Sequence, residues 1–197
     1  LNVINNQLET CDTLILGGGM SYTFIKGMGY EGGKSLVDSE KIDYCMQMIK
    51  KAETLGKNLY LPKDVVTAKN FPDPIDAKVE TFIHDIDSIP ADEEALDIGP
   101  KTRKLYAEVI KGAKTVIWNG PVGVSENPCF AGGTIAIAQA LADTDATTII
   151  GGGDSAAAVT KLGFADKMTH ISTGGGASLE LFEGKKLPGI ECLNDKD

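Results

Sequence analysis

Residues 147–159, TTIIGGGDSAAAV, join an apolar β-branched run to an alanine-rich run through three glycines and one aspartate. The first run is typical of a buried strand and the second of a helix, so the glycines lie at the junction between them. Two further glycine triplets stand at similar junctions, at residues 17–19 and 174–176, and IWNGPVG at 117–123 is a variant. The recurring order of strand, glycines and helix predicts βαβ units around a parallel sheet. A short helix at 177–184 and then a tail are expected to follow the last triplet.

These junctions are expected to lie close together in the folded protein. The carboxyl ends of the strands of a parallel α/β sheet meet at one edge, and ligands bind there. The start of a helix exposes unpaired N–H groups and carries about half a positive charge, and glycines let a phosphate approach that bare backbone. The sequence therefore predicts a site for a polyphosphate-like ligand at this edge.

The charge balance excludes one class of partner. The chain carries 19 basic and 28 acidic residues among 197, which gives a net charge of −9. Binding to a phosphate backbone relies on clustered Lys and Arg, so we expect no nucleic-acid partner. The sequence has no signal segment and no apolar run of 18 residues, so we also expect a cytoplasmic protein without a membrane partner.

A dinucleotide site is the first alternative for the glycine loop. Gly151, Gly153 and Ala156 satisfy the spacing GxGxxA that is typical of dehydrogenases. That site needs an acidic residue about 20 positions further on, to bind a ribose hydroxyl. Residues 172–174 read STG there, which makes a dehydrogenase the weaker hypothesis.

A second glycine pattern invites a different phosphate-loop interpretation. Residues 29–35, GYEGGKS, end like the motif GxxxxGK[ST], but Met28 stands where that motif needs its first glycine. The segment also does not lie between a strand and a helix. We therefore expect a solvated turn.

Two carboxylates near the predicted edge are candidate ligand contacts. Asp154 follows a glycine triplet, where a bound phosphate would repel it unless a cation such as Mg²⁺ lay between them. The alternative is that Asp154 caps the next helix, and Ser155 could also cap it or donate to a phosphate. Glu126 follows a Pro-Gly turn and could accept hydrogen bonds from ribose hydroxyls, although a lone Glu is usually only solvated.

Taken together, the motifs resemble the phosphoglycerate kinase family, in its carboxyl-terminal, nucleotide-binding half. The similarity spans essentially all 197 residues, in family order. The segments that carry it are LILGGGMSYTF, GKSL, LPKDVVTA, ALDIGP, VIWNGPVGVSE, IIGGGDSAAA and HISTGGGASLELFEGKKLPG.

The resemblance implies a fold and an activity. The implied fold is an α/β, doubly wound, mainly parallel sheet with helices on both faces, a Rossmann-like three-layer sandwich formed by residues 1–197. The implied ligands are ADP or ATP with Mg²⁺. The family's enzyme is a glycolytic transferase of two domains that moves a phosphoryl group between 1,3-bisphosphoglycerate and ADP, and we expect the full-length protein to be a monomer.

Position by position, the resemblance also implies site residues. The walls of the adenine site are Gly18, Gly19, Leu36 and Leu96. The residues that border the nucleotide are Asn119, Pro121 and Val122, with Glu126 as the ribose-binding glutamate. The phosphate loop is Gly152, Gly153, Asp154 and Ser155, with Asp154 as the metal ligand. The catalytic glycines that face the transferring group are Gly153, Gly175 and Gly176. Two positions depart from many family members, Ala95 in place of glycine and Ser125 in place of phenylalanine.

Parts of the family's site are expected to lie outside this sequence. The phosphate-clamping lysines of the family precede the position of Leu1, and the domain that binds phosphoglycerate is the amino-terminal half. The sequence contains one arginine, Arg103, to balance substrate phosphates. We therefore expect this chain to bind nucleotide but to have negligible turnover by itself. The alternative is a non-catalytic nucleotide-binding module.

Overall fold

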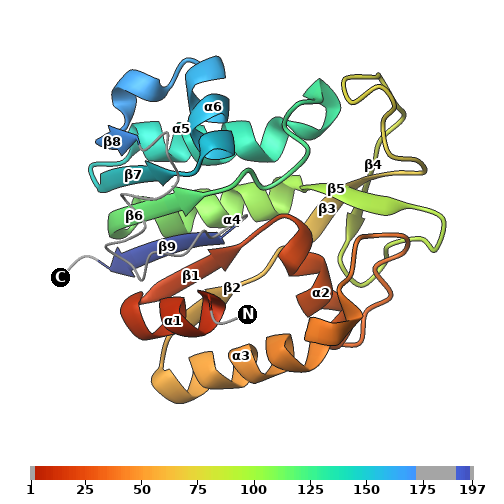
Figure 1. Cartoon of the computed structure of the whole chain (residues 1–197), viewed down its shortest axis with the longest axis horizontal. Coiled ribbons are helices and arrows are strands. Elements are labelled where there is room, and N and C mark those ends of the chain that lie inside the picture. Colours follow the sequence, from red (N-terminus) through yellow and green to blue (C-terminus); the bar gives the residue numbers. More distant parts are fainter. Residues whose placement is uncertain (1–2, 172–189, 196–197) are drawn as a thin grey trace.

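The computed structural model describes residues 3–171 and 190–195, which form two sheets flanked by helices (Figure 1). The larger sheet has six strands in the order β2-β1-β9-β6-β7-β8, and the smaller has three in the order β4-β3-β5. Within these residues, no helix is long and apolar enough to cross a membrane.

The large sheet is mainly parallel, as expected. The strand pairs β1–β2, β6–β7 and β7–β8 are parallel, whereas β9 is antiparallel to both β1 and β6. Residues 190–195, which the sequence suggested were only a tail, form a central strand. The strands of this sheet are β1 (Thr13–Leu16), β2 (Asn58–Tyr60), β6 (Ala113–Asn119), β7 (Thr147–Gly151), β8 (His170–Ile171) and β9 (Ile190–Asp195).

Helices cover both faces of the large sheet, which confirms the three-layer α/β fold. On one face Trp118 and Ile150 pack with residues of α4, α5 and α6, and on the other Leu14 and Ile117 pack with residues of α1, α2 and α3. Neighbouring residues of β6 thus belong to opposite cores, which explains its continuous apolar run. The α-helices are α1 (Val3–Thr10), α2 (Gly19–Gly27), α3 (Ile42–Leu55), α4 (Pro100–Lys111), α5 (Gly132–Asp143) and α6 (Gly153–Lys161), and the 3₁₀ turns are η1 (Ser39–Lys41), η2 (Pro128–Phe130) and η3 (Ala165–Lys167).

The small sheet is formed within residues 64–98, outside the recurring order of strand, glycines and helix. It consists of β3 (Asp64–Ala68), β4 (Phe82–Asp85) and β5 (Glu94–Ile98), all paired antiparallel. In β4, Ile83 and Asp85 are exposed while Phe82 and His84 are half-buried, the alternation of a half-exposed strand. The small sheet lies beside the carboxyl-terminal edge of the large one in Figure 1.

A buried aspartate fastens the small sheet to α4. The Asp64 carboxylate accepts hydrogen bonds from the backbone N–H groups of Lys101 (3.0 Å) and Thr102 (2.9 Å) and from the Thr102 hydroxyl (2.7 Å). The residue before the helix, Gly99, has no side chain to supply such a cap, and a Cβ there would lie 2.3 Å from Asp64 Cγ. Asp64, the first residue of β3, thus caps α4, which begins at Pro100.

Replacing Asp64 with alanine is expected to destabilise the fold by about 2–4 kcal/mol, because it removes a helix cap and leaves the N–H groups of Lys101 and Thr102 without their acceptor. Urea unfolding measures the change. The matched control is Asp38→Ala, which removes the exposed cap of η1 and is expected to cost less than about 1 kcal/mol. Equal losses in the two variants would contradict the role assigned to Asp64.

Candidate functional site

Three glycine-rich segments meet where the parallel strands end. Residues 17–19 connect β1 to α2, residues 151–153 connect β7 to α6, and residues 120–123 follow β6. The last residues of β6 and β7 are direct partners, Asn119 with Gly151. The sequence-based prediction that these junctions share one edge of the sheet is confirmed (Figure 1).

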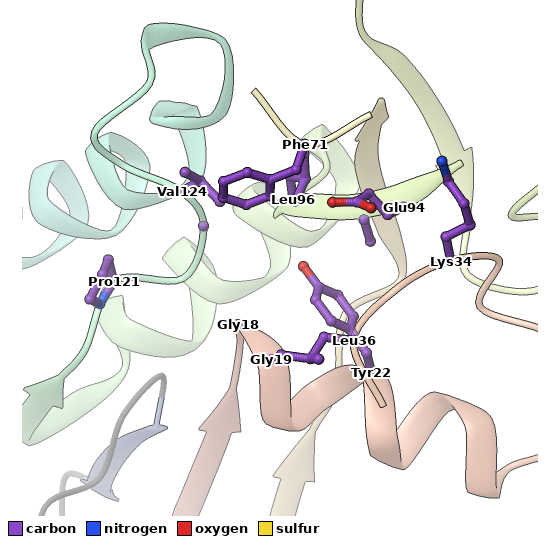
Figure 2. A pocket seen from close by; sticks show the side chains of 12 residues that line it. Gly18, Gly19, Tyr22, Lys34, Leu36, Phe71, Glu94, Leu96, Pro121 and Val124 are labelled. Carbon is purple, nitrogen blue, oxygen red and sulfur yellow. The ribbon is translucent and has the colours of Figure 1, made fainter. Parts of the chain in front are cut away.

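A cavity of about 430 Å³ opens beside these junctions (Figure 2). Five of the residues that the sequence predicted for a nucleotide site line it: Gly18, Gly19, Leu36, Leu96 and Pro121. They come from α2, the segment before η1, β5 and the segment after β6, so the chain brings four separate parts together here. Ala95, where many family members have glycine, also lines this cavity.

Leu36 is held at the rim by its neighbours in the chain. The Lys34 N–H donates to the Glu93 carbonyl (2.8 Å), and the Ser35 hydroxyl oxygen accepts from the Ala95 N–H (2.9 Å). Only 8% of Ser35 is exposed, so the expectation of a fully solvated turn is wrong for this residue. Leu36 itself is 78% exposed, which leaves its apolar side chain available to a ligand.

Sequence reasoning missed several lining residues, among them Tyr22, Phe71 and Glu94. The Tyr22 hydroxyl points into the cavity in Figure 2. Burial raises the pKa of Tyr22, and the nearby Asp97 and Glu94 raise it further, so the hydroxyl stays protonated and can donate a hydrogen bond. The spacing of Gly19 and Tyr22, one helical turn apart on α2, is the signal that could have identified Tyr22.

Two helices begin at this edge without a side-chain cap. Gly18 precedes α2 and Gly152 precedes α6, both with positive φ angles, 69° and 86°. A Cβ at Gly152 would lie 2.3 Å from Asn119 Oδ1, so only glycine fits between α6 and β6. Uncapped helix starts can bind an anion through their free N–H groups.

Asp154 lies in the first turn of α6 and is exposed. Its carboxylate makes no cap bond to the helix, so the structure does not support the capping alternative. Among the described residues no group of three or more His, Cys, Asp or Glu could hold a metal ion. Asp154 fits Mg²⁺ only as one carboxylate ligand, with further oxygens coming from water and a bound phosphate.

The remaining predicted residues fall in different places. Ser155 is fully buried, and its hydroxyl oxygen accepts a hydrogen bond from the Gly120 N–H, which joins α6 to the segment after β6. Val122 is also fully buried, against Gly17, and belongs to the core. Glu126 is exposed and lines a second hollow together with Asp154. Residues 174–176, including Gly175 and Gly176, lie outside the described residues.

A buried ion pair supports the wall of the cavity. The Asp97 carboxylate accepts hydrogen bonds from Arg103 Nη2 (3.0 Å) and from the backbone N–H groups of Gly133 (2.9 Å) and Ile98 (2.9 Å). A Cβ at Gly123 would lie 2.4 Å from Asp97 Oδ1, and one at Gly133 would lie 2.2 Å from it. Burial raises the pKa of Asp97 to about 7, against the opposing effects of the Gly133 amide and Arg103.

The sequence matches a known protein family. A family profile described as phosphoglycerate kinase matches residues 1–185. The phosphoglycerate kinase of Clostridium botulinum (strain Alaska E43) is 61% identical over 193 residues, which cover 98% of this chain and 48% of that relative. The enzyme of Clostridium perfringens (strain SM101) is 60% identical over 196 residues, with 100% and 48% coverage. The chain thus spans about half the length of the curated relatives it matches.

The fold is similar to those of solved phosphoglycerate kinase structures. Phosphoglycerate kinase from Coxiella burnetii matches with a TM-score of 0.87 and 40% identity, covering 93% of this chain and 46% of that one. Phosphoglycerate kinase from Pyrococcus horikoshii matches with a TM-score of 0.74 and 31% identity, covering 95% and 46%.

The raised pKa of Asp97 predicts a pH-dependent stability. In the unfolded chain this carboxyl loses its proton near its ordinary pKa of 3.8, whereas the folded chain keeps the proton up to about pH 7. The contribution of Asp97 to the free energy of unfolding is therefore complete below pH 4. It is lost as the pH rises to 7, by an amount on the order of 4 kcal/mol. Urea unfolding of the wild type and of Asp97→Asn between pH 4 and 8 tests this. The stability of the wild type relative to the variant is expected to fall over that range, and a constant difference would contradict it.

Proposed function

The chain belongs to the phosphoglycerate kinase family, and we propose that it is the nucleotide-binding domain of such a kinase, with ADP or ATP and Mg²⁺ as its ligands. One observation carries this proposal. A largely apolar cavity stands beside two uncapped helix starts at the same edge of the sheet. That combination matches a molecule with a flat apolar base and a phosphate tail.

The cavity is the proposed site of the base. Its volume of about 430 Å³ lies within the range of roughly 300–1,000 Å³ that is usual for small-molecule pockets. Leu36, Leu96 and Phe71 offer apolar surface to the faces of a purine, and the Tyr22 hydroxyl offers one hydrogen bond to its edge. Apolar walls with a few placed polar groups are the usual composition of such sites.

The phosphates are proposed to extend from the cavity toward α6. Gly152 and Gly153 there present bare backbone at a helix start, and Asn119 lies directly beside Gly152. Asp154 is the proposed ligand of the Mg²⁺ ion, which would neutralise charge on the phosphate oxygens. Glu126, two positions after the cavity residue Val124, is the proposed partner of the ribose hydroxyls.

In the whole enzyme, the proposed reaction is phosphoryl transfer between 1,3-bisphosphoglycerate and ADP in glycolysis. Such a reaction depends on positioning and on neutralising charge around the transferred group, where Gly153, Gly175 and Gly176 are the proposed contacts. The one arginine of this chain, Arg103, is held by Asp97 and is not available for a substrate phosphate. We therefore expect nucleotide binding without turnover from residues 1–197 alone.

Shortening the exposed wall residue tests the base site. Leu36→Ala is expected to weaken binding of Mg-ADP by about 3- to 10-fold, because part of a leucine side chain loses its contact with the base. Isothermal titration calorimetry measures the affinity. Ile83→Ala is the matched control, since Ile83 is 60% exposed on β4 and does not line the cavity. An unchanged affinity in Leu36→Ala would place the base elsewhere.

Removing the Asp154 carboxylate tests the metal site. The wild type is expected to bind ADP more tightly with Mg²⁺ than without it, and Asp154→Ala to lose most of this enhancement, about tenfold. Asp166→Ala removes an exposed carboxylate of η3 and serves as the control. If Asp154→Ala keeps the full enhancement, the metal assignment is wrong.

Adding an amino-terminal half tests the enzymatic part of the proposal. The chain alone is expected to show no kinase turnover, and turnover is expected to appear on mixing with a separately prepared amino-terminal half of a phosphoglycerate kinase. Nucleotide binding without turnover in the mixture would favour the non-catalytic module. Heat released on adding NAD but not Mg-ADP would favour the dehydrogenase.

A further inference from the structure

Two polar side chains lack a partner in the first cavity, the one of about 430 Å³ beside the glycine junctions. The Glu94 carboxylate and the Tyr22 hydroxyl both line it, and neither makes a hydrogen bond or an ion pair with a described residue. Glu94 is half-buried at the start of β5, and Tyr22 is 7% exposed on α2. Figure 2 shows the Glu94 carboxylate on the side of the cavity toward which the Tyr22 hydroxyl points.

The basic residue of this cavity does not neutralise Glu94. Among the described residues, Lys34 is the one lysine or arginine that lines the cavity, and its ammonium group donates a hydrogen bond to the Lys69 carbonyl. Burial raises the pKa of Tyr22, and the charges of Asp97 and Glu94 raise it further, so the hydroxyl keeps its proton. The side chains left for a ligand are therefore one acceptor, Glu94, and one donor, Tyr22.

A base that presents one donor beside one acceptor matches this pair. A carboxylate only accepts hydrogen bonds, whereas a protonated tyrosine hydroxyl can donate one. The edge of adenine formed by position 6 and N7 carries the N6 amino donor beside the N7 acceptor, whereas the same edge of guanine or hypoxanthine carries two acceptors, O6 and N7. Two acceptors would need a second donor, and the lone pairs of O6 would face the Glu94 carboxylate.

We propose that Glu94 selects the base of the nucleotide, by accepting a hydrogen bond from the N6 amino group of adenine while the Tyr22 hydroxyl donates to N7. Glu94 is then a specificity-determining residue of the first cavity. This inference rests on the proposed nucleotide site, and it adds to that site a choice of 6-amino over 6-oxo purines.

Calorimetric titration with three diphosphates, in the presence of Mg²⁺, tests the choice of base. ADP is expected to bind most tightly. Purine riboside 5′-diphosphate, which lacks only the N6 amino group, is expected to bind about tenfold more weakly, the loss of one hydrogen bond to a charged group. Inosine 5′-diphosphate, which carries O6 in its place, is expected to lose at least about as much.

The outcomes of this titration separate the inference from the proposed function. If ADP binds but either of the other diphosphates binds equally well, the role of Glu94 is refuted and the nucleotide site stands. If none of the three binds, both the nucleotide site and the role of Glu94 are refuted.

Two variants assign the preference to Glu94. Glu94→Gln keeps the shape of the side chain and supplies an amide N–H for O6, so it is expected to bring the affinity ratio of ADP to inosine diphosphate close to one. Glu94→Leu removes the acceptor and is expected to bind ADP and purine riboside diphosphate equally. Glu108→Gln changes an exposed glutamate of α4 that does not line the cavity, and is expected to keep both wild-type ratios.

Each ratio is taken within one variant, so a general loss of affinity does not imitate the expected result. Unfolding curves establish which variants fold. Wild-type ratios in folded Glu94→Gln or Glu94→Leu would refute the role of Glu94. If neither variant folds, the comparison of the three diphosphates on the wild type carries the test.

Discussion

The buried contact between Asp97 and Arg103 is the constraint on which the arrangement of the site depends. Through that one carboxylate, β5 is joined to α4 and to the first turn of α5. Gly123 and Gly133 must stay without side chains because Asp97 occupies the space that a Cβ would need. Gly123 also lines the first cavity, so the ion pair determines how closely the segment after β6 approaches β5. A polar pair that is buried and hydrogen-bonded in this way fixes geometry more than it adds stability.

The helix starts divide into two kinds. The start of α4 is satisfied by Asp64 from a distant strand, whereas α2 and α6 begin at glycines and receive no side-chain cap. Glycine at an N-cap is only about a few tenths of a kcal/mol less favourable than Ser, Thr, Asp or Asn, so the fold gives up little stability at these two helix starts. The capped helix stabilises the scaffold, and the two uncapped ones leave N–H groups free for an anionic ligand.

The sequence predicted those parts of the fold in which apolar runs end at glycines, namely β1, β6, β7 and the helices that follow. It did not predict β3 and β5, because their buried Asp64, Thr67 and Asp97 interrupt the apolar pattern, and each has a hydrogen-bond partner that lies more than 20 positions away in the chain. Of the residues that the family resemblance implied for the nucleotide site, Gly18, Gly19, Leu36, Leu96 and Pro121 line the first cavity. Phe71 reaches the cavity only through tertiary packing, which local spacing does not encode, whereas the helical spacing of Tyr22 from Gly19 could have indicated Tyr22.

The central position of β9 governs the order in which the sheet can form during synthesis. The pair β2-β1 and the trio β6-β7-β8 are joined only through β9 in the described sheet. Until residue 195 has left the ribosome, the inner edges of β1 and β6 therefore lack their shared neighbour, and each can pair with a wrong strand. Both halves of the sheet can form before β9 is made, but their union waits for this strand, which lies more than 70 positions after β6 begins, so translation of β9 sets the earliest moment at which the described sheet is complete.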